Sequence, residues 1–235
     1  MKSDIGRILI GFLCVCATAF ASSDFHPEVN DELKVSFNWV SVDFKPGTTT
    51  TVSEFRFWYG AECKDVFPLL IDTNKMPQRH KAYEDARTLT EKTYQDIVKA
   101  APKTLEDLKK IIGDTHVKSE YNRDPNGHWS DYIYQNFNFP WPLSNRWGVI
   151  RLRVDESNGP TLQEYRAEFK TAVGNFVTNE GFWELVPVQS QPGMCEWRGH
   201  YEADPGIPLP KIITKQGVKI GLKREVEENR ALLKK

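Results

Sequence analysis

The chain has 235 residues, of which 31 are Lys or Arg and 32 are Asp or Glu, so its formal net charge is −1. A chain this close to neutral has no general electrostatic attraction for nucleic acid or anionic lipid headgroups, which argues against nucleic-acid binding. Hydrophobic residues make up 40% and charged residues 27%, proportions that are ordinary for a globular domain.

The first 21 residues have the pattern of a secretory signal peptide. Lys2 and Arg7 give a positive start, residues 8–20 form an apolar run, and Ala19 and Ala21 stand at cleavage spacing. The apolar run is shorter than the ~20 residues of a membrane-spanning helix, which disfavours the alternative of an uncleaved anchor. We therefore predict a secreted or periplasmic protein that has no stable membrane span after cleavage.

The mature chain begins with the pattern of a β-hairpin. Alternating apolar residues predict a strand over 34–44, with a bulge where the phase slips at Trp39. Pro46 opens a turn, and the β-rich segment 50–59 predicts the returning strand. A short helix is expected over 61–71.

The middle of the chain is more polar and predicts a helical pair. We expect a loop over 72–81, a strand over 83–91, and helices over 93–101 and 105–112. Thr104 stands at the position of an N-cap for the second helix.

The remaining chain predicts further strands and a closing helix. The expected strands cover 129–137, 149–154, 162–171, 182–188 and 194–203. A long helix is expected from about 209 to 233, with its apolar stripe at Leu209, Ile213, Gly217, Ile220 and Arg224 covering the sheet. With no internal repeat and no low-complexity linker, the sequence predicts one domain over 22–235.

Sequence motifs of catalysis and metal binding are missing. There is no nucleophile elbow, zinc-protease motif, P-loop or dinucleotide fingerprint, and the five histidines lack metal-ligand spacing. We therefore assign no catalytic residue, metal or cofactor. An enzyme would need an acid–base pair such as His200 with Glu184 or Arg146, but strand phase places His200 opposite Trp197 and Tyr201.

Four motifs in order resemble the START-like, or helix-grip (SRPBCC, Bet v 1-like), family of lipid-binding domains. They are S-E-F-R at 53–56 followed by V-F-P-L-L-I-D at 66–72, P-W-P-L-S-N-R at 140–146, G-F-W-E-L-V-P at 181–187, and D-P-G-I-P at 204–208. The chain is longer than the family core where the charged helical pair lies, which predicts a helical insertion over 92–128.

The resemblance implies an α+β helix-grip fold, in which a curved antiparallel sheet wraps around a long C-terminal helix. It also implies an apolar cavity between sheet and helix. The candidate ligand-binding residues are Trp141, Arg146, Trp183, Trp197, Tyr201, Leu209 and Ile213. The alternative for the aromatic residues is core packing, and the alternative for Arg146 is a structural ion pair.

The two cysteines of the mature chain, Cys63 and Cys195, form either one disulfide or two buried free thiols. The family resemblance implies that the second hairpin strand pairs antiparallel with the last strand. Cys63 follows the first of these and Cys195 begins the other, so the resemblance implies a Cys63–Cys195 disulfide.

These observations favour an exported binding module that binds or carries a lipid or other apolar small molecule. One alternative is a cyclase- or hydrolase-like enzyme on the same fold. The other is a partner-docking protein that uses the insertion at 93–113 and fills its cavity with side chains. The sequence predicts neither the ligand nor a protein partner.

Overall fold

The computed structural model describes residues 37–119, 123–138, 145–207 and 209–234. The strands are β1 (Asn38–Phe44), β2 (Thr51–Tyr59), β3 (Tyr83–Leu89), β4 (His128–Phe137), β5 (Arg146–Asp155), β6 (Tyr165–Gly174), β7 (Thr178–Pro187) and β8 (Cys195–Asp204). The helices are α2 (Cys63–Ile71), α3 (Met76–Arg79), α4 (Glu91–Ala100), α5 (Leu105–Ile112), α6 (Gly159–Leu162) and α7 (Lys211–Leu233), with a 3-10 turn η1 (Thr73–Lys75). The predicted signal peptide lies outside the described residues.

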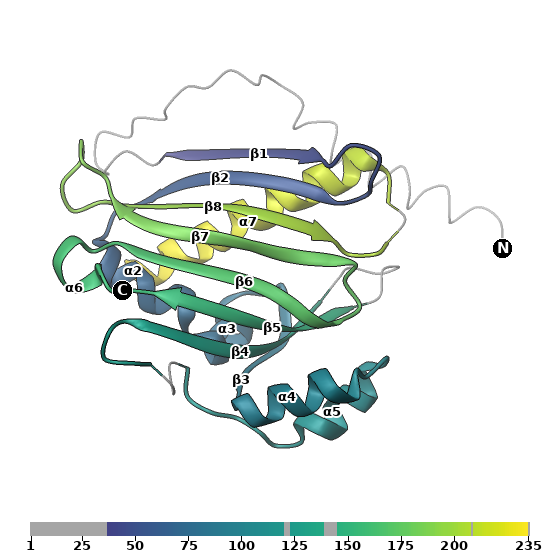
Figure 1. The fold of residues 1–235 in the computed structure, drawn as a ribbon. Coiled ribbons are helices and arrows are strands. Elements are labelled where there is room, and N and C mark those ends of the chain that lie inside the picture. Colours follow the sequence, from purple (N-terminus) through teal and green to yellow (C-terminus); the bar gives the residue numbers. More distant parts are fainter. Residues whose placement is uncertain (1–36, 120–122, 139–144, 208, 235) are drawn as a thin grey trace.

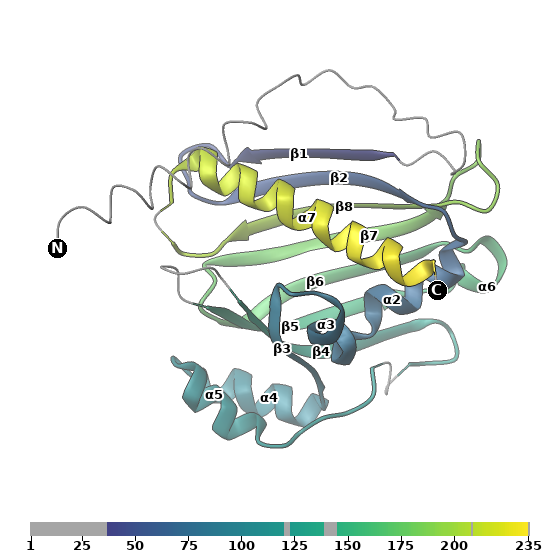
Figure 2. The same ribbon diagram turned by 180° about the vertical axis from the view of Figure 1, so that it is seen from behind.

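The strands form one antiparallel sheet in the order β1-β2-β8-β7-β6-β5-β4-β3. Consecutive strands from β3 to β8 are neighbours, and the β1–β2 hairpin joins the sheet at β8. The sheet curves, and α7 crosses its concave face from the β1–β2 edge toward α2 (Figures 1 and 2). This arrangement confirms the predicted α+β helix-grip fold and the predicted antiparallel pairing of β2 with β8.

The main core lies on the concave, inner face of the sheet. It combines side chains of every strand from β2 to β8 except β3 with α2 and the C-terminal half of α7. Its largest fully buried side chains include Phe55, Phe57, Tyr59, Leu185 and Trp197. Burying aromatic side chains of this size supplies much of the hydrophobic stabilisation of a domain.

A second, smaller core lies on the outer face, where the predicted helical pair packs against β3, β4 and β5. It contains Leu89, Ile97, Leu108, Ile112, Tyr132, Tyr134, Trp147 and Val149. Thr90 caps α4 by accepting a bond from the Thr93 amide at 3.1 Å. Thr104 caps α5 in the same way, through the Asp107 amide at 3.1 Å, as the sequence predicted.

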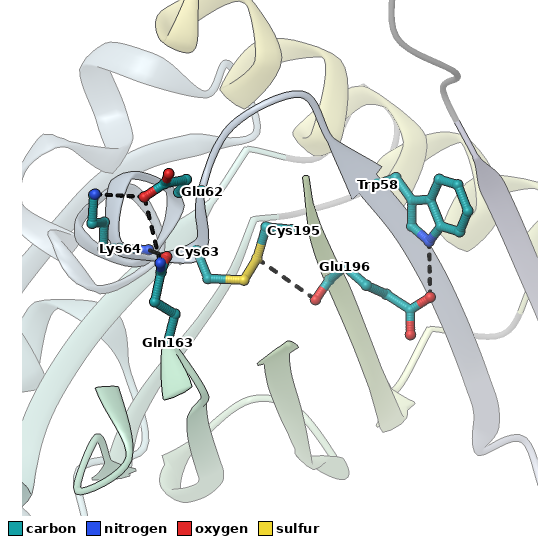
Figure 3. Close-up of a disulfide and its surroundings, with 7 residues drawn as sticks. All are labelled: Trp58, Glu62, Cys63, Lys64, Gln163, Cys195 and Glu196. Carbon is teal, nitrogen blue, oxygen red and sulfur yellow. Dashed lines mark hydrogen bonds and ion pairs between the residues drawn. A yellow bond between two sulfur atoms is a disulfide. The ribbon is translucent and has the colours of Figure 1, made fainter. Parts of the chain in front are cut away.

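The disulfide between Cys63 and Cys195 joins α2 to β8, as the family resemblance implied. Their Cα atoms are 4.9 Å apart, and Tyr59, at the end of β2, pairs directly with Cys195. Figure 3 shows the bridge beside Glu196, whose buried carboxylate accepts a bond from Trp58 Nε1 at 2.9 Å. The end of β2, the start of α2 and the start of β8 are therefore fastened together.

Three local predictions were wrong. The predicted bulge at Trp39 does not occur, because β1 pairs with β2 in unbroken register and Trp39 faces outward from an edge strand. The predicted loop over 72–81 contains η1 and α3, so short helical turns form within a polar segment. Residues Ile213 and Ile220 are 49% and 61% exposed, so the predicted apolar stripe of the last helix does not cover the sheet.

We expect the double variant Cys63→Ser/Cys195→Ser to fold with a free energy of unfolding lower by about 4–5 kcal/mol, because a bridge across so long a loop restricts the unfolded chain. The bridged residues are 132 positions apart. Urea unfolding followed by tryptophan fluorescence measures the loss, and the wild-type protein unfolded in a reducing agent is the control. An unchanged unfolding midpoint in both would contradict a stabilising bridge.

Candidate functional site

The open end of the concave face carries a set of aromatic side chains that the core does not fully bury. The set consists of Tyr83, Phe137, Phe169, Phe176 and Tyr201, all partly exposed. We call it the inner aromatic surface. The ring centroids of Tyr83 and Phe137 are 4.9 Å apart, and those of Phe169 and Tyr201 are 5.1 Å apart. Partly exposed aromatic rings on a concave face are typical of a surface that receives an apolar ligand.

Helix α7 closes only one end of this face. Its C-terminal half buries Leu222, Val226 and Asn229, whereas Val218 in the other half is only partly buried against the core. Its closest backbone contacts are with β1, β2 and α2 at the edge of the fold. The N-terminal half of α7 lies over the β1–β2 edge of the sheet (Figure 2), and the aromatic rings of the inner aromatic surface remain partly exposed.

One stripe of α7 connects the buried half to this open region. Val218, Gly221 and Glu225 are spaced by three and four residues, so they lie on one side of the helix. A Cβ atom added at Gly221 would meet no heavy atom within 4 Å. Gly221 is itself exposed, so the space beside it is open, and glycine within a helix costs about 1 kcal/mol relative to alanine.

Glu225 is the charged residue of that stripe, and it is partly buried, on the side of α7 that carries the buried Leu222 and Asn229. Burial raises the pKa of its carboxyl group, the nearby His80 opposes this rise, and Glu228 adds to it. Among the described residues no hydrogen bond or ion pair to the Glu225 carboxylate is found. An enclosed carboxylate without a partner destabilises the folded state in its ionised form.

Tyrosines from three strands lie within electrostatic range of Glu225. Burial raises the pKa values of Tyr201, Tyr83 and Tyr59, and the negative charge of Glu225 contributes to each rise. These residues belong to β8, β3 and β2, three strands of the same sheet. On the next turn of α7, Glu228 bonds to the buried His80 ring at 2.8 Å and also pairs with Arg224.

Two predicted ligand-binding residues belong to the packed core. Trp197 is 1% exposed and its ring contacts Phe55 and Phe57 at centroid distances of 4.7 Å and 5.9 Å. Trp183 is 6% exposed and lies 6.4 Å from Phe67. Their location fits the alternative reading of these tryptophans as core residues.

The other predicted site residues are more dispersed. Tyr201 lies on the inner aromatic surface, whereas Leu209 is partly buried in the connection before α7 and Ile213 points toward solvent. Arg146 donates to the backbone carbonyls of Pro205 and Asn145, and burial lowers the pKa of its guanidinium. Arg146 thus fastens the start of β5 to the connection that leads into α7. Trp141 lies outside the described residues.

The outer face carries charged side chains in a network. Glu184 binds both Arg166 and Arg198, with 2.9 Å between its carboxylate and Arg198 Nε. His200 is stacked on Phe182 and lies 3.5 Å from Glu202. His200 therefore faces away from the inner aromatic surface, as strand phase predicted, and cannot act there as an acid or base.

Two hollows lie on the same outer side. The larger, of about 630 Å³, is lined by charged and polar residues of β4, β5 and β6, including Arg151, Arg153 and Glu168. The smaller, of about 170 Å³, lies between β3 and the end of α5. Mixed charges of this kind are poorly suited to an apolar ligand. Within the described ranges, no helix is long and apolar enough to cross a membrane, and no cluster of three potential metal ligands occurs.

Solved structures share this arrangement. The STAR-related lipid transfer protein from Xanthomonas axonopodis aligns over 83% of this chain and 93% of its own, with a TM-score of 0.56 and 18% identity. The chain has the START-like, helix-grip fold. The lipid transfer and protein localization domain of human StarD13 aligns over 95% of both chains, with a TM-score of 0.54 and 10% identity. No protein-family model and no curated protein matches the sequence.

Sequence reasoning found the START-like fold but missed most of the inner aromatic surface. Phe169 alternates with charged residues in the strand predicted over 162–171, a pattern that marks its face as apolar and does not single it out as a ligand contact. Tyr83 and Phe137 are paired across β3 and β4, a register that the sequence does not disclose. Glu225 stands in a strongly charged segment near the end of the sequence, and only the rotation of α7 about its axis shows that it lies on the same side as the buried Leu222 and Asn229.

The raised pKa of Glu225 predicts a pH-dependent cost to stability. At pH below the ordinary value of 4.5 the group is protonated in both the folded and the unfolded chain. As the pH rises, the unfolded chain releases this proton first, so the free energy of unfolding falls until the pH passes the pKa of the folded state. The total loss is about 1.4 kcal/mol for each unit by which the pKa of the folded state exceeds that of the unfolded state.

We therefore expect Glu225→Gln to unfold at a higher temperature than the wild type at pH 8 and at the same temperature at pH 4. Calorimetry across this range measures the difference. Glu227→Gln is the matched control, because Glu227 is an exposed partner of Arg230 on the same helix and exposed ion pairs contribute little. A Glu225→Gln variant that is less stable than the wild type at pH 8 would show that the carboxylate has a stabilising partner.

Proposed function

We propose that this protein binds an apolar small molecule of the lipid class on the inner aromatic surface, beneath the N-terminal half of α7, and carries or sequesters it. The observation that carries the proposal is the set of five partly exposed aromatic rings on the concave face of the sheet. A ligand that covers them gains about 25 cal/mol for each Å² of apolar area removed from water.

The names of the structural relatives support a lipid ligand. The Xanthomonas axonopodis protein is described as a lipid transfer protein, and the human domain as a lipid transfer domain. Both share the fold at low sequence identity, so they support the ligand class and leave the particular ligand open. Binding an apolar molecule also requires no catalytic group.

The disulfide supports the proposal that this ligand is bound outside the cytoplasm. Bridges such as Cys63–Cys195 form and persist in oxidising compartments and are rare in reducing ones. The signal-peptide pattern of residues 1–21 points to the same compartments. Fractionation of the host's cells with an antibody against the mature domain tests this part of the proposal, and a purely cytoplasmic signal contradicts it.

Filling the space beside Gly221 should weaken binding. We expect Gly221→Phe to lower the affinity for the uncharged fluorophore N-phenyl-1-naphthylamine, because the added ring occupies space that the ligand would use. Displacing about 50 Å² of apolar contact costs about 1.3 kcal/mol, or roughly tenfold in affinity. Fluorescence titration measures the dissociation constant.

Gln216→Phe is the matched control for this titration, because Gln216 is exposed on the opposite side of the same helix. It adds the same ring away from the inner aromatic surface and should leave the affinity unchanged. Equal losses in both variants, or no loss in either, would contradict the placement of the ligand. Native mass spectrometry of the protein purified from its own host complements the titration, since a stoichiometric apolar adduct would reveal the natural ligand.

A further inference from the structure

We propose that the ligand carries a protonated amine, and that Glu225 binds this group by a charge-assisted hydrogen bond. This inference rests on the proposed function and deepens it, because it assigns a headgroup chemistry to the same site. It starts from a partly buried carboxylate on the sheet-facing side of α7, for which no hydrogen bond or ion pair is found among the described residues.

The first support is the isolation of the Glu225 carboxylate. In the described part of the chain most enclosed carboxylates have a cationic or hydrogen-bonding partner. Glu196 is 4% exposed and binds Arg56 and Trp58, and Glu184 lies between two arginines. Glu225 has no such partner among the described residues, although it lies on the stripe of α7 that borders the inner aromatic surface. A group so placed is available to a ligand.

The second support is the surroundings of that carboxylate. The titratable side chains of other elements that interact electrostatically with Glu225 are His80 before β3, Tyr83 on β3, Tyr201 on β8 and Tyr59 on β2. His80 is already bonded to Glu228 at 2.8 Å. The rings of Tyr83 and Tyr201 add electron-rich faces, which attract an ammonium group. A carboxylate with aromatic neighbours is a favourable site for a cation and an unfavourable one for an anion.

The same surroundings discriminate between headgroups. A fatty acid or a phosphate would bring a second negative charge toward Glu225 and Glu228, where a low local dielectric strengthens repulsion. A hydroxyl group would donate a neutral hydrogen bond, whereas an ammonium group would donate a charge-assisted one, which is roughly twice as strong. Burial raises the pKa of the Glu225 carboxyl group. A bound ammonium group would lower that pKa again, because it stabilises the ionised carboxylate.

Three probes of equal chain length separate these headgroups: decylamine, 1-decanol and decanoate. Each is titrated at pH 7, where an alkylamine is protonated, against protein loaded with N-phenyl-1-naphthylamine. We expect the wild-type protein to bind decylamine at least about tenfold more tightly than 1-decanol, because only the amine forms a charge-assisted bond. Decanoate should bind most weakly of the three.

The variant Glu225→Gln should lose the preference for the amine and keep its affinity for 1-decanol, since the amide has similar shape and no charge. Glu227→Gln is the matched control and should keep the preference, because Glu227 faces solvent on the same helix and pairs with Arg230. Thermal unfolding of both variants establishes that they are folded.

The outcomes separate this inference from the proposed function. Equal affinities of the wild-type protein for amine and alcohol, or an amine preference that persists in Glu225→Gln, would overturn the headgroup assignment while apolar binding stands. Tighter binding of decanoate than of decylamine would overturn it as well. If the fluorophore and all three probes fail to bind, both the headgroup assignment and the proposed function are wrong.

Discussion

The antiparallel pairing of β2 with β8 is the contact on which the rest of the structure depends. It joins the N-terminal hairpin to the last strand and completes an eight-stranded sheet from segments far apart in sequence. The same pairing sets Tyr59 opposite Cys195, so the chain just beyond β2 can form the disulfide. It also places α7, which follows β8, across the concave face, where Arg230 donates to the Trp58 carbonyl of β2. Without this pairing there would be no enclosed inner face.

The two faces of the sheet then take different chemical roles because side chains alternate along each strand. On β8, Trp197 and Tyr201 point inward while Glu196, Arg198 and His200 point outward. Outward charges meet partners on neighbouring strands, and Glu184 bridges two arginines across β6, β7 and β8. Several outer-face charges are thereby paired, and α4 and α5 cover another part of this face with a second core. The partly exposed rings of the inner aromatic surface lie on the opposite face.

Alternation and turn residues are local signals, so the sequence alone predicted the strands, the helical pair and the Thr104 cap. The rotation of α7 about its own axis depends instead on how the helix packs against the rest of the fold. This helix carries two apolar stripes, one with Ile213 and Ile220 and one with Val218, Leu222 and Val226. The prediction chose the first stripe and was wrong, because the second stripe packs against the sheet. Likewise, Trp183 and Trp197 were candidate ligand contacts under the family resemblance, but large rings fill a core as readily as they line a pocket. Which aromatic rings stay exposed depends on how far α7 stands from the middle strands, which is a property of the assembled fold.

The partial closure of α7 links stability to function. Its C-terminal half completes the core through Leu222, Val226 and Asn229, so the helix remains docked whether or not a ligand is present. Its N-terminal half contains Gly217 and Gly221, which lower helix propensity. Val218 in the same half is only partly buried against the core. A fold selected for stability alone would fill that region with larger side chains and would not enclose Glu225 without a partner. If the concave face binds a molecule with an apolar body and a cationic end, as proposed above, each of these costs is recovered, because the body covers the rings and the charge pairs with the carboxylate.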